Sequence, residues 1–180
     1  SEMCIRDRPL IMLFLIMKKV ILGATGSIGS SLAKKLVDSG EQVHLVGRDE
    51  GSLSELANEL NSTFTTCDVL EENFSEKIIN DLKDEQVNGL AYCVGSIDLK
   101  PLKLTKKSDF MQSFNLNLVS ATEIIKSLAD NLKASKGSIV LFSTVAVQQG
   151  FPNHAIVSSA KGAVEGLTLA LAAEYAPNIR

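Results

Sequence analysis

The sequence predicts an α/β protein, a single domain built on one doubly wound parallel sheet. Short apolar segments alternate with longer segments of helical periodicity along most of the 180 residues. A glycine-rich turn, GATGSIG, separates the first apolar segment from the first helical one. Buried strands that alternate with helices are typical of a parallel sheet covered on both faces. A chain of this length suffices for one domain with a hydrophobic core, which we expect over residues 17–180.

The first half of the chain repeats a strand–helix unit three times. The strand and helix ranges are 18–23 and 27–39, 42–46 and 51–60, and 63–67 and 73–82. Each strand has the length expected for a buried strand. Gly40 ends the first helix, and Leu53, Leu56 and Leu60 form one face of the second. These units predict three parallel strands.

The second half continues the alternation with longer helices. The ranges are strand 87–94, helix 108–132, strand 138–142 and helix 153–174. The first of these helices carries apolar residues at helical spacing, namely Phe110, Phe114, Leu118, Ala121, Ile125, Leu128 and Leu132. The whole chain therefore predicts five parallel strands.

Composition excludes several function classes. The net charge of -3 gives no basic surface for nucleic acid. Cys4, Cys67 and Cys93 have no paired spacing, which argues against a disulfide framework or a metal site and for a reducing compartment. We interpret Cys67 and Cys93 as small core residues near strand ends. We therefore expect a cytoplasmic protein.

The N-terminal segment differs from the rest. Its apolar run from Leu10 to Met17 has eight residues, far short of the ~20 needed to cross a bilayer. The string MCIRD resembles the translation of a common sequencing adaptor. We interpret residues 1–16 as non-native or disordered, with a natural start at Met12 or Met17. No association with a membrane is expected.

The turn GATGSIG has the form of a dinucleotide-binding loop. Without side chains, the backbone approaches a pyrophosphate, and the N–H groups at the helix start bind it. The last glycine lets helix and strand pack closely. A loop that is merely glycine-rich is the alternative, but the strand before it and the helix after it favour binding. The candidate cofactor-binding residues here are Gly23, Thr25, Gly26, Ser27, Ile28 and Gly29.

The end of the second strand favours NADP(H) over NAD(H). An acidic residue there would bind the ribose hydroxyls of NAD, but the sequence has Gly47 followed by Arg48. A guanidinium pairs with a 2′-phosphate, whereas a carboxylate would repel it. Asp49 is acidic and adjacent, and we interpret it as the N-cap of the next helix. NAD stays a possible cofactor.

Five stretches resemble the short-chain dehydrogenase/reductase family over about residues 17–180. They are GATGSIG, CDV at 67–69, NLVSA from Asn117, IVLFSTVAV and AKGAVEGLTLALAAEYAPNIR. The resemblance implies a Rossmann-like fold and hydride transfer between a nicotinamide cofactor and a small alcohol or carbonyl. It also implies that Asp68 and Val69 contact the adenine ring. In AYCVG, Gly95 is the residue that matches the family's cofactor loop.

The same resemblance implies a catalytic set, which this sequence matches in part. Asn117 matches the asparagine of the long helix, and Lys161 the lysine of the last. Either Ser143 or Thr144 could supply the hydroxyl that donates to a substrate carbonyl. The family's tyrosine is replaced by Val157. Lys161 then serves first as a ligand of the nicotinamide ribose, and the alternative is a surface lysine with its stem on apolar surface.

Without the phenol, the proton for an alkoxide must come from elsewhere. His154 shares a helix face with Val157 and Lys161, about 10 Å along the axis from the lysine. An imidazole is a competent acid, although a solvated histidine at the helix start is the alternative. Tyr92, at the end of the fourth strand, is a second candidate.

The resemblance also sets expectations for the C-terminal region and for partners. The family continues past NIR with further strands, so we expect a partial dinucleotide-binding domain whose fifth strand lies at a sheet edge. Family members often form dimers or tetramers, so we expect a homo-oligomer for the full-length protein. Leu167, Leu171 and Ala172 would form helix contacts between subunits, or else pack on the sheet.

Three functions remain open. The leading hypothesis is an NADP(H)-dependent oxidoreductase for a small-molecule substrate, with a non-standard proton donor. Val157 motivates the second, a catalytically impaired NAD(P)H-binding protein that acts as a sensor or partner subunit. The G-x-x-G-x-x-G spacing motivates the third, a nucleotide-sugar epimerase or NmrA-like protein.

Overall fold

The computed structural model describes residues 17–83 and 85–180, so the interpretation of residues 1–16 falls outside the described part of the chain. The strands are β1 (Met17–Leu22), β2 (Gln42–Gly47), β3 (Thr63–Thr66), β4 (Gln86–Tyr92) and β5 (Ser138–Leu141). The α-helices are α1 (Ser27–Asp38), α2 (Glu50–Glu59), α3 (Phe74–Leu82), α4 (Lys107–Phe114), α5 (Ser120–Ala134), α6 (Ala146–Gln149) and α7 (Ala155–Tyr175). A 3₁₀ turn, η1 (Leu102–Leu104), and a π-helical turn, η2 (Asn115–Val119), lie between β4 and α5.

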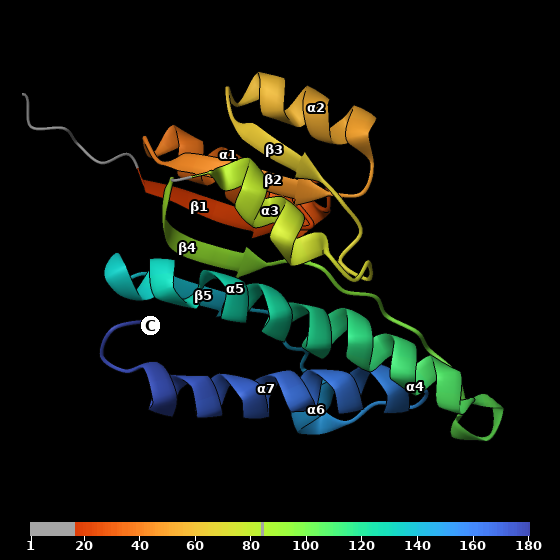
Figure 1. Cartoon of the computed structure of the whole chain (residues 1–180). Helices are drawn as coiled ribbons and strands as arrows, with labels where there is room; N and C mark the ends of the chain where they lie inside the picture. Colours follow the sequence, from red (N-terminus) through yellow and green to blue (C-terminus); the bar gives the residue numbers. More distant parts are fainter. Residues whose placement is uncertain (1–16, 84) are drawn as a thin grey trace, which may run out of the picture.

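The strands form one parallel sheet in the order β3-β2-β1-β4-β5. The chain moves outward from β1 through β2 to β3, then returns to the other side of β1 for β4 and β5 (Figure 1). This reversal makes the sheet doubly wound, which confirms the predicted fold class. In such sheets ligands bind where the strand order reverses, at the carboxyl ends of the strands.

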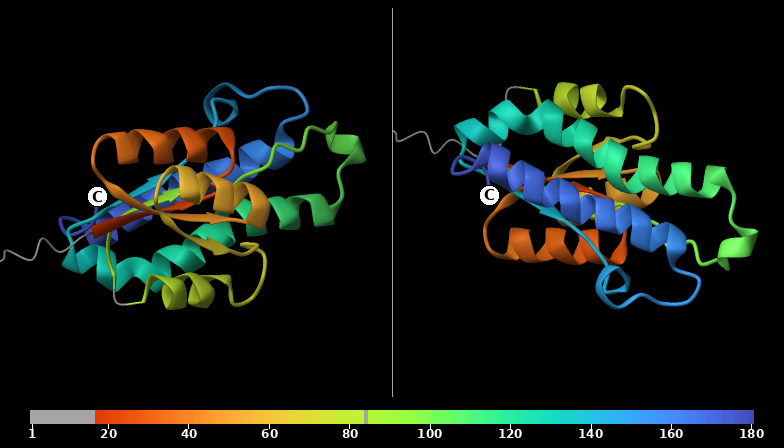
Figure 2. Two further views of the ribbon diagram at one scale, coloured as in Figure 1. Left: turned by 90° about the horizontal axis from the view of Figure 1, so that it is seen from above. Right: turned by 90° about the horizontal axis from the view of Figure 1, so that it is seen from below.

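Helices cover both faces of the sheet, and each face has its own core (Figure 2). One core joins the sheet to α1 and α2 through Ile21, Ala33, Val43, Leu45, Leu53 and Ala57. The other joins it to α3 and α5 through Val20, Leu22, Phe74, Ile78, Ile124, Ile125, Leu128 and Leu132. Burial on both faces explains why the strands read as continuous apolar runs.

Two features of the second half were not predicted. The expected helix 108–132 is present, but a π-helical turn divides it into α4 and α5. A short helix, α6, lies between β5 and α7. Helical spacing of apolar residues continues through a π turn with little change, so periodicity alone does not reveal it.

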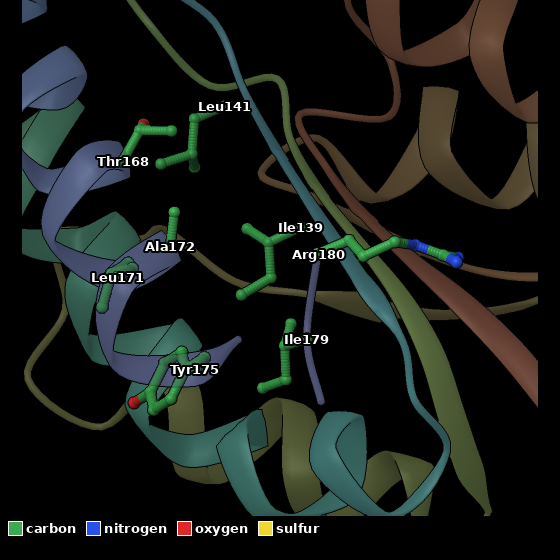
Figure 3. Close-up of a pocket in the computed structure, with 8 residues that line it drawn as sticks. All are labelled: Ile139, Leu141, Thr168, Leu171, Ala172, Tyr175, Ile179 and Arg180. Carbon is green, nitrogen blue, oxygen red and sulfur yellow. The ribbon is translucent and has the colours of Figure 1, made fainter. Parts of the chain in front are cut away.

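The face of α7 turned toward β5 closes a small apolar pocket of about 70 Å³. Figure 3 shows Leu171 and Ala172 of α7 lining it opposite Ile139 and Leu141 of β5. Leu171 therefore packs toward the sheet, which is the second of the two placements expected for it. By length and composition α7 could cross a membrane, but it lies beside α4 and η2 as a helix of the fold (Figure 1).

Strand β5 is the outermost strand on its side, as predicted. Its edge is partly paired, however. The Ile139 N–H donates to the Arg180 carbonyl (2.7 Å), and the Arg180 N–H donates to the Gly137 carbonyl (3.0 Å). The last residues of the chain thus lie alongside β5 and cover part of an edge that was expected to be open.

Candidate functional site

A crevice of about 690 Å³ opens at the carboxyl ends of the strands, where the strand order reverses. It lies within the size range of small-molecule and cofactor sites. Seven of the predicted cofactor-binding residues line it, namely Gly23, Thr25, Gly26, Arg48, Asp68, Val69 and Gly95. The fold therefore brings together residues from four separate loops.

The glycine turn between β1 and α1 has room only for glycine at two positions. A Cβ on Gly29 would lie 2.3 Å from the Gly23 carbonyl oxygen, so α1 could not pack against the turn. Gly23 has a φ of +74°, and a Cβ there would lie 3.0 Å from the backbone of Cys93. Gly26 is the N-cap of α1 and offers no side-chain acceptor. The first N–H groups of a helix have no intrahelical partner and so suit an anion.

The acidic and basic residues after β2 and β3 have separate roles. The Asp49 carboxylate accepts a hydrogen bond from the Ser52 N–H (2.8 Å) and caps α2. Hydrogen bonding from the side chain of Ser52, and then from its backbone N–H, holds the pKa of Asp49 below its usual value. The Arg48 side chain is 76% exposed and its guanidinium lies 3.7 Å from the Asp68 carboxylate. Asp49 is therefore a helix cap, and Arg48 is the basic group at the rim of the crevice.

On the opposite side, the π turn presents Asn117 from within the long helix. Its amide nitrogen donates to the Ser113 carbonyl (2.9 Å). The Ser120 hydroxyl lies 2.9 Å from the Asn115 carbonyl and 2.8 Å from the Val69 carbonyl, which ties η2 to the loop after β3. The Asn117 side chain is buried, yet its carbonyl oxygen has no hydrogen-bond partner among the described residues. A buried acceptor left open is costly unless a ligand or water uses it.

Lys161 of α7 meets Asn117 beside Gly95. A Cβ on Gly95 would lie 3.0 Å from the Asn117 carbonyl oxygen and 3.4 Å from Lys161 Nζ. Burial lowers the pKa of Lys161. Within residues 17–83 and 85–180, Nζ has no ion pair and no hydrogen bond, so the ammonium is free to bind a ligand. This placement argues against the alternative of a surface lysine.

Val157 and the two hydroxyl residues complete the predicted set. Val157 is 3% exposed and its side chain cannot ionise. The Ser143 hydroxyl donates to the Glu165 carboxylate of α7 (2.5 Å). Thr144 accepts a hydrogen bond from the Ala146 N–H (3.3 Å) at the start of α6, which leaves its own hydrogen available. Of the two hydroxyls, Thr144 is the one whose hydrogen is not donated to another described residue.

The two other candidate proton donors, His154 and Tyr92, are engaged elsewhere. His154 precedes α7, and its Nδ1 lies 2.8 Å from the Pro152 carbonyl. A carbonyl only accepts, so that nitrogen carries the hydrogen. The Tyr92 side chain is 2% exposed, and its hydroxyl donates to the Leu116 carbonyl (2.7 Å). Burial also raises the pKa of Tyr92, so it does not act as an acid in the crevice.

Comparison with known proteins agrees with this geometry. Residues 18–180 match the family described as short chain dehydrogenase. The chain belongs to that family. It is 32% identical over 157 residues to L-fucose dehydrogenase of Oryctolagus cuniculus, with 85% of this chain and 55% of that protein covered. It is 30% identical over 166 residues to L-xylulose reductase of Bos taurus, with 89% and 66% covered.

A solved structure shows the same fold. An alcohol dehydrogenase from the archaeon Thermococcus sibiricus, complexed with 5-hydroxy-NADP, superposes with a TM-score of 0.83 at 23% identity. That match covers 91% of this chain and 73% of the other. The short chain dehydrogenase described here spans only 55% and 66% of the length of the two curated relatives.

The crevice of this short chain dehydrogenase fits a pyridine dinucleotide. Its glycine turn has no room for a side chain at Gly23 or Gly29, and among the described residues Asn117 presents an unpartnered buried acceptor near the ammonium of Lys161. Among the lining residues that were not predicted from the sequence are Ser96, Gln112 and Leu116. No motif marks them, because they reach the crevice only through the packing of the loop after β4 against α4 and η2.

The two cysteines of the described region behave as predicted. Cys67 is buried in the core beneath α3, and Cys93 packs partly buried against the core of α1 and α2. Burial raises the pKa of each thiol to about 11. Neither thiol is therefore reactive near neutral pH.

Proposed function

We propose that the protein is an NADP(H)-dependent oxidoreductase of the short-chain type. It transfers hydride between the nicotinamide and a small alcohol or carbonyl, with a proton donor other than tyrosine. One observation carries this proposal: the glycine turn, Arg48 and Gly95 line a cofactor-sized crevice, and Gly95 lies beside Asn117 and Lys161. We further propose that it works in the cytoplasm, as a homo-oligomer when full length.

The preference for NADP(H) rests on Arg48. Its guanidinium lies at the rim of the crevice, 3.7 Å from its nearest carboxylate, Asp68, and is mostly exposed. So long and weak an ion pair leaves the guanidinium free to turn toward a 2′-phosphate. Asp49 also lines the crevice, but one of its carboxylate oxygens is used to cap α2.

When bound, the reduced nicotinamide supplies the hydride, and the protein supplies binding and a proton. Lys161 holds the nicotinamide ribose with its free ammonium, and the open carbonyl of Asn117 accepts a hydrogen bond beside it. The Thr144 hydroxyl donates to the substrate oxygen and orients it. The N–H groups at the start of α1 bind the pyrophosphate.

Val157 supports a second candidate function. A valine that is 3% exposed fills the position of the proton donor, so the chain could bind NADP(H) as a sensor or partner subunit without turnover. Replacing Val157 with Tyr distinguishes the two. The oxidoreductase proposal expects turnover before the change and a higher kcat after it, whereas a protein without turnover in either form would act by binding alone.

The proposal is tested by fluorescence titration with NADPH and NADH, followed by a carbonyl panel. The panel should include L-xylulose and other sugars, because two relatives are named for sugar substrates. We expect Arg48→Ala to weaken NADPH binding about tenfold, as expected for losing one charge-assisted hydrogen bond. NADH binding should not change. Equal effects on both coenzymes would contradict the NADP(H) preference.

A further inference from the structure

The position of Val157 leaves a carbonyl reduction without an obvious acid. Hydride addition to a carbonyl produces an alkoxide, which must receive a proton. The hydroxyl hydrogens of Tyr92 and Ser143 are already donated, to the Leu116 carbonyl and the Glu165 carboxylate respectively. An aliphatic hydroxyl such as that of Thr144 can orient a substrate but is too weak an acid to give up its proton.

Lys161 differs from these groups in two respects. Its ammonium carries three hydrogens, and none of them is donated to another described residue. It also lies beside Gly95, a residue of the crevice wall, because a Cβ on Gly95 would lie 3.4 Å from Nζ and 3.0 Å from the open oxygen of Asn117. The one protonated group with free hydrogens at this wall is therefore the lysine that binds the cofactor, as far as the described residues extend.

We propose that the Lys161 ammonium is itself the acid that protonates the substrate oxygen. This inference rests on the proposed oxidoreductase function. It assigns Lys161 a second task, since a lysine that only holds the ribose would keep its proton throughout.

The step balances without a further reagent. Hydride from the reduced nicotinamide dinucleotide forms the new C–H bond, and the π pair of the carbonyl moves to oxygen. That oxygen takes a proton from Nζ, so the carbonyl is reduced to an alcohol, the dinucleotide is oxidised and Lys161 becomes a neutral amine. Water then returns the proton to the amine.

The surroundings of Lys161 suit a group that loses a proton. Burial lowers the pKa of Lys161, and no charged side chain contributes to that shift. On α7 itself, Glu165 is one turn further on and accepts from Ser143. A depressed pKa brings the ammonium closer to the working pH, where a general acid is most effective.

Replacing Lys161 with Arg separates binding from proton transfer. Arginine keeps the positive charge and the hydrogen-bond donors, but it does not deprotonate in proteins. We expect Lys161→Arg to keep its NADPH dissociation constant within about threefold, while kcat for carbonyl reduction falls about 100-fold. The exposed lysine of α5 gives a matched control, Lys126→Arg, which should change neither quantity.

Two further measurements test the inference without relying on the kcat of one variant: an NMR titration of Lys161 and the pH dependence of kcat. With ¹³C-lysine, the Lys161 Cε resonance, assigned by its absence in the Lys161→Arg protein, should titrate below the other lysines. In the wild type, kcat for reduction should fall as pH rises through that same pKa. Retained kcat in Lys161→Arg, or a Lys161 resonance that titrates with the rest, would overturn the inference. No turnover by a wild type that binds NADPH would overturn the oxidoreductase function as well.

Discussion

A lysine side chain is buried, fully or in part, at each end of the sheet. The two lysines differ in whether the protein supplies partners for the ammonium group. At the amino ends of the strands, Lys18 is 6% exposed, forms an ion pair with Glu85 (2.5 Å) and donates to the Thr63 hydroxyl (2.8 Å). At the carboxyl ends, Lys161 has no such partner in the described part of the chain. The first lysine is satisfied by the fold, whereas the second is left for a ligand.

The neighbours of the two lysines repeat the contrast. Near Lys18, the fully buried His44 lies 2.8 Å from the Thr63 hydroxyl and 3.0 Å from the Thr65 hydroxyl. Thr65 in turn donates to the Asp81 carboxylate (2.6 Å). Near Lys161, the buried oxygen of Asn117 stays open. A polar network that is closed on itself indicates a structural role, and an open one indicates a binding site.

We expect acid to cause the largest loss of stability, because it protonates a group inside the closed network. Burial, with a smaller effect of Lys18, lowers the pKa of His44 from 6.5 to about 4. The unfolded chain therefore binds the proton first, so the contribution of His44 to stability is constant above pH 6.5 and falls toward pH 4. The loss should reach about 3 kcal/mol by linkage. Urea unfolding across this range measures it, and His44→Gln should flatten the fall; an unchanged slope in that variant would assign the loss to other groups.

Replacing Lys18, the lysine with partners, should cause the second-largest loss of stability. Lys18→Met keeps the apolar stem but leaves Glu85 without its cation and Thr63 without its donor. We expect the free energy of unfolding to fall by about 2 kcal/mol, the usual cost of losing a charged hydrogen bond at a partly buried site. Urea unfolding at pH 7 measures this, and a variant as stable as the wild type would show that the network does not stabilise the fold.

Replacing Lys161 with Met should change the free energy of unfolding in the opposite direction. Lys161→Met removes a desolvated charge that no described residue pairs, so we expect unfolding to cost slightly more, by less than about 1 kcal/mol. Turnover should be lost at the same time. A destabilised Lys161→Met protein would mean that the ammonium has a structural partner, and the contrast between the two lysines would fail.

Replacing Asp49 should have the smallest effect on stability, and it tests whether this residue only caps α2. Asp49→Ala removes the acceptor for the Ser52 N–H at the start of α2 and should lower the melting temperature slightly. The dissociation constants of NADPH and NADH should both stay unchanged. Asp49→Asn, which keeps a capping oxygen, provides the control. Weaker NADH binding in Asp49→Ala would show that this carboxylate contacts the ribose instead.

The sequence predicted the strands and the main helices to within about two residues, because apolar runs and helical periodicity report burial directly. The glycine turn was marked by its residue types, whereas Asn117 and Lys161 were singled out by the resemblance to the family, and the structure brings both side chains close to Gly95. What the sequence did not predict depends on which way side chains point. Tyr92 turns from the crevice to the Leu116 carbonyl, and Ser143 pairs with Glu165. Both contacts join residues more than 20 positions apart, so no local pattern shows them.

The closed network around His44 was missed for a related reason. Lys18 and His44 lie in strands that otherwise read as apolar, and their partners come from β3 and the residue before β4. Only the strand order, with β1 and β2 between β3 and β4, brings these groups together. Spacing along the chain carries no sign of that adjacency.

On our interpretation, Lys161 has no partner within residues 17–83 and 85–180 because the crevice binds a pyridine dinucleotide. Fluorescence titration with NADPH of the wild type and of Lys161→Met tests this most directly. We predict saturable binding by the wild type and a dissociation constant about tenfold higher in Lys161→Met, the size expected for one charged hydrogen bond. No binding by the wild type, or the same dissociation constant in both proteins, would contradict it.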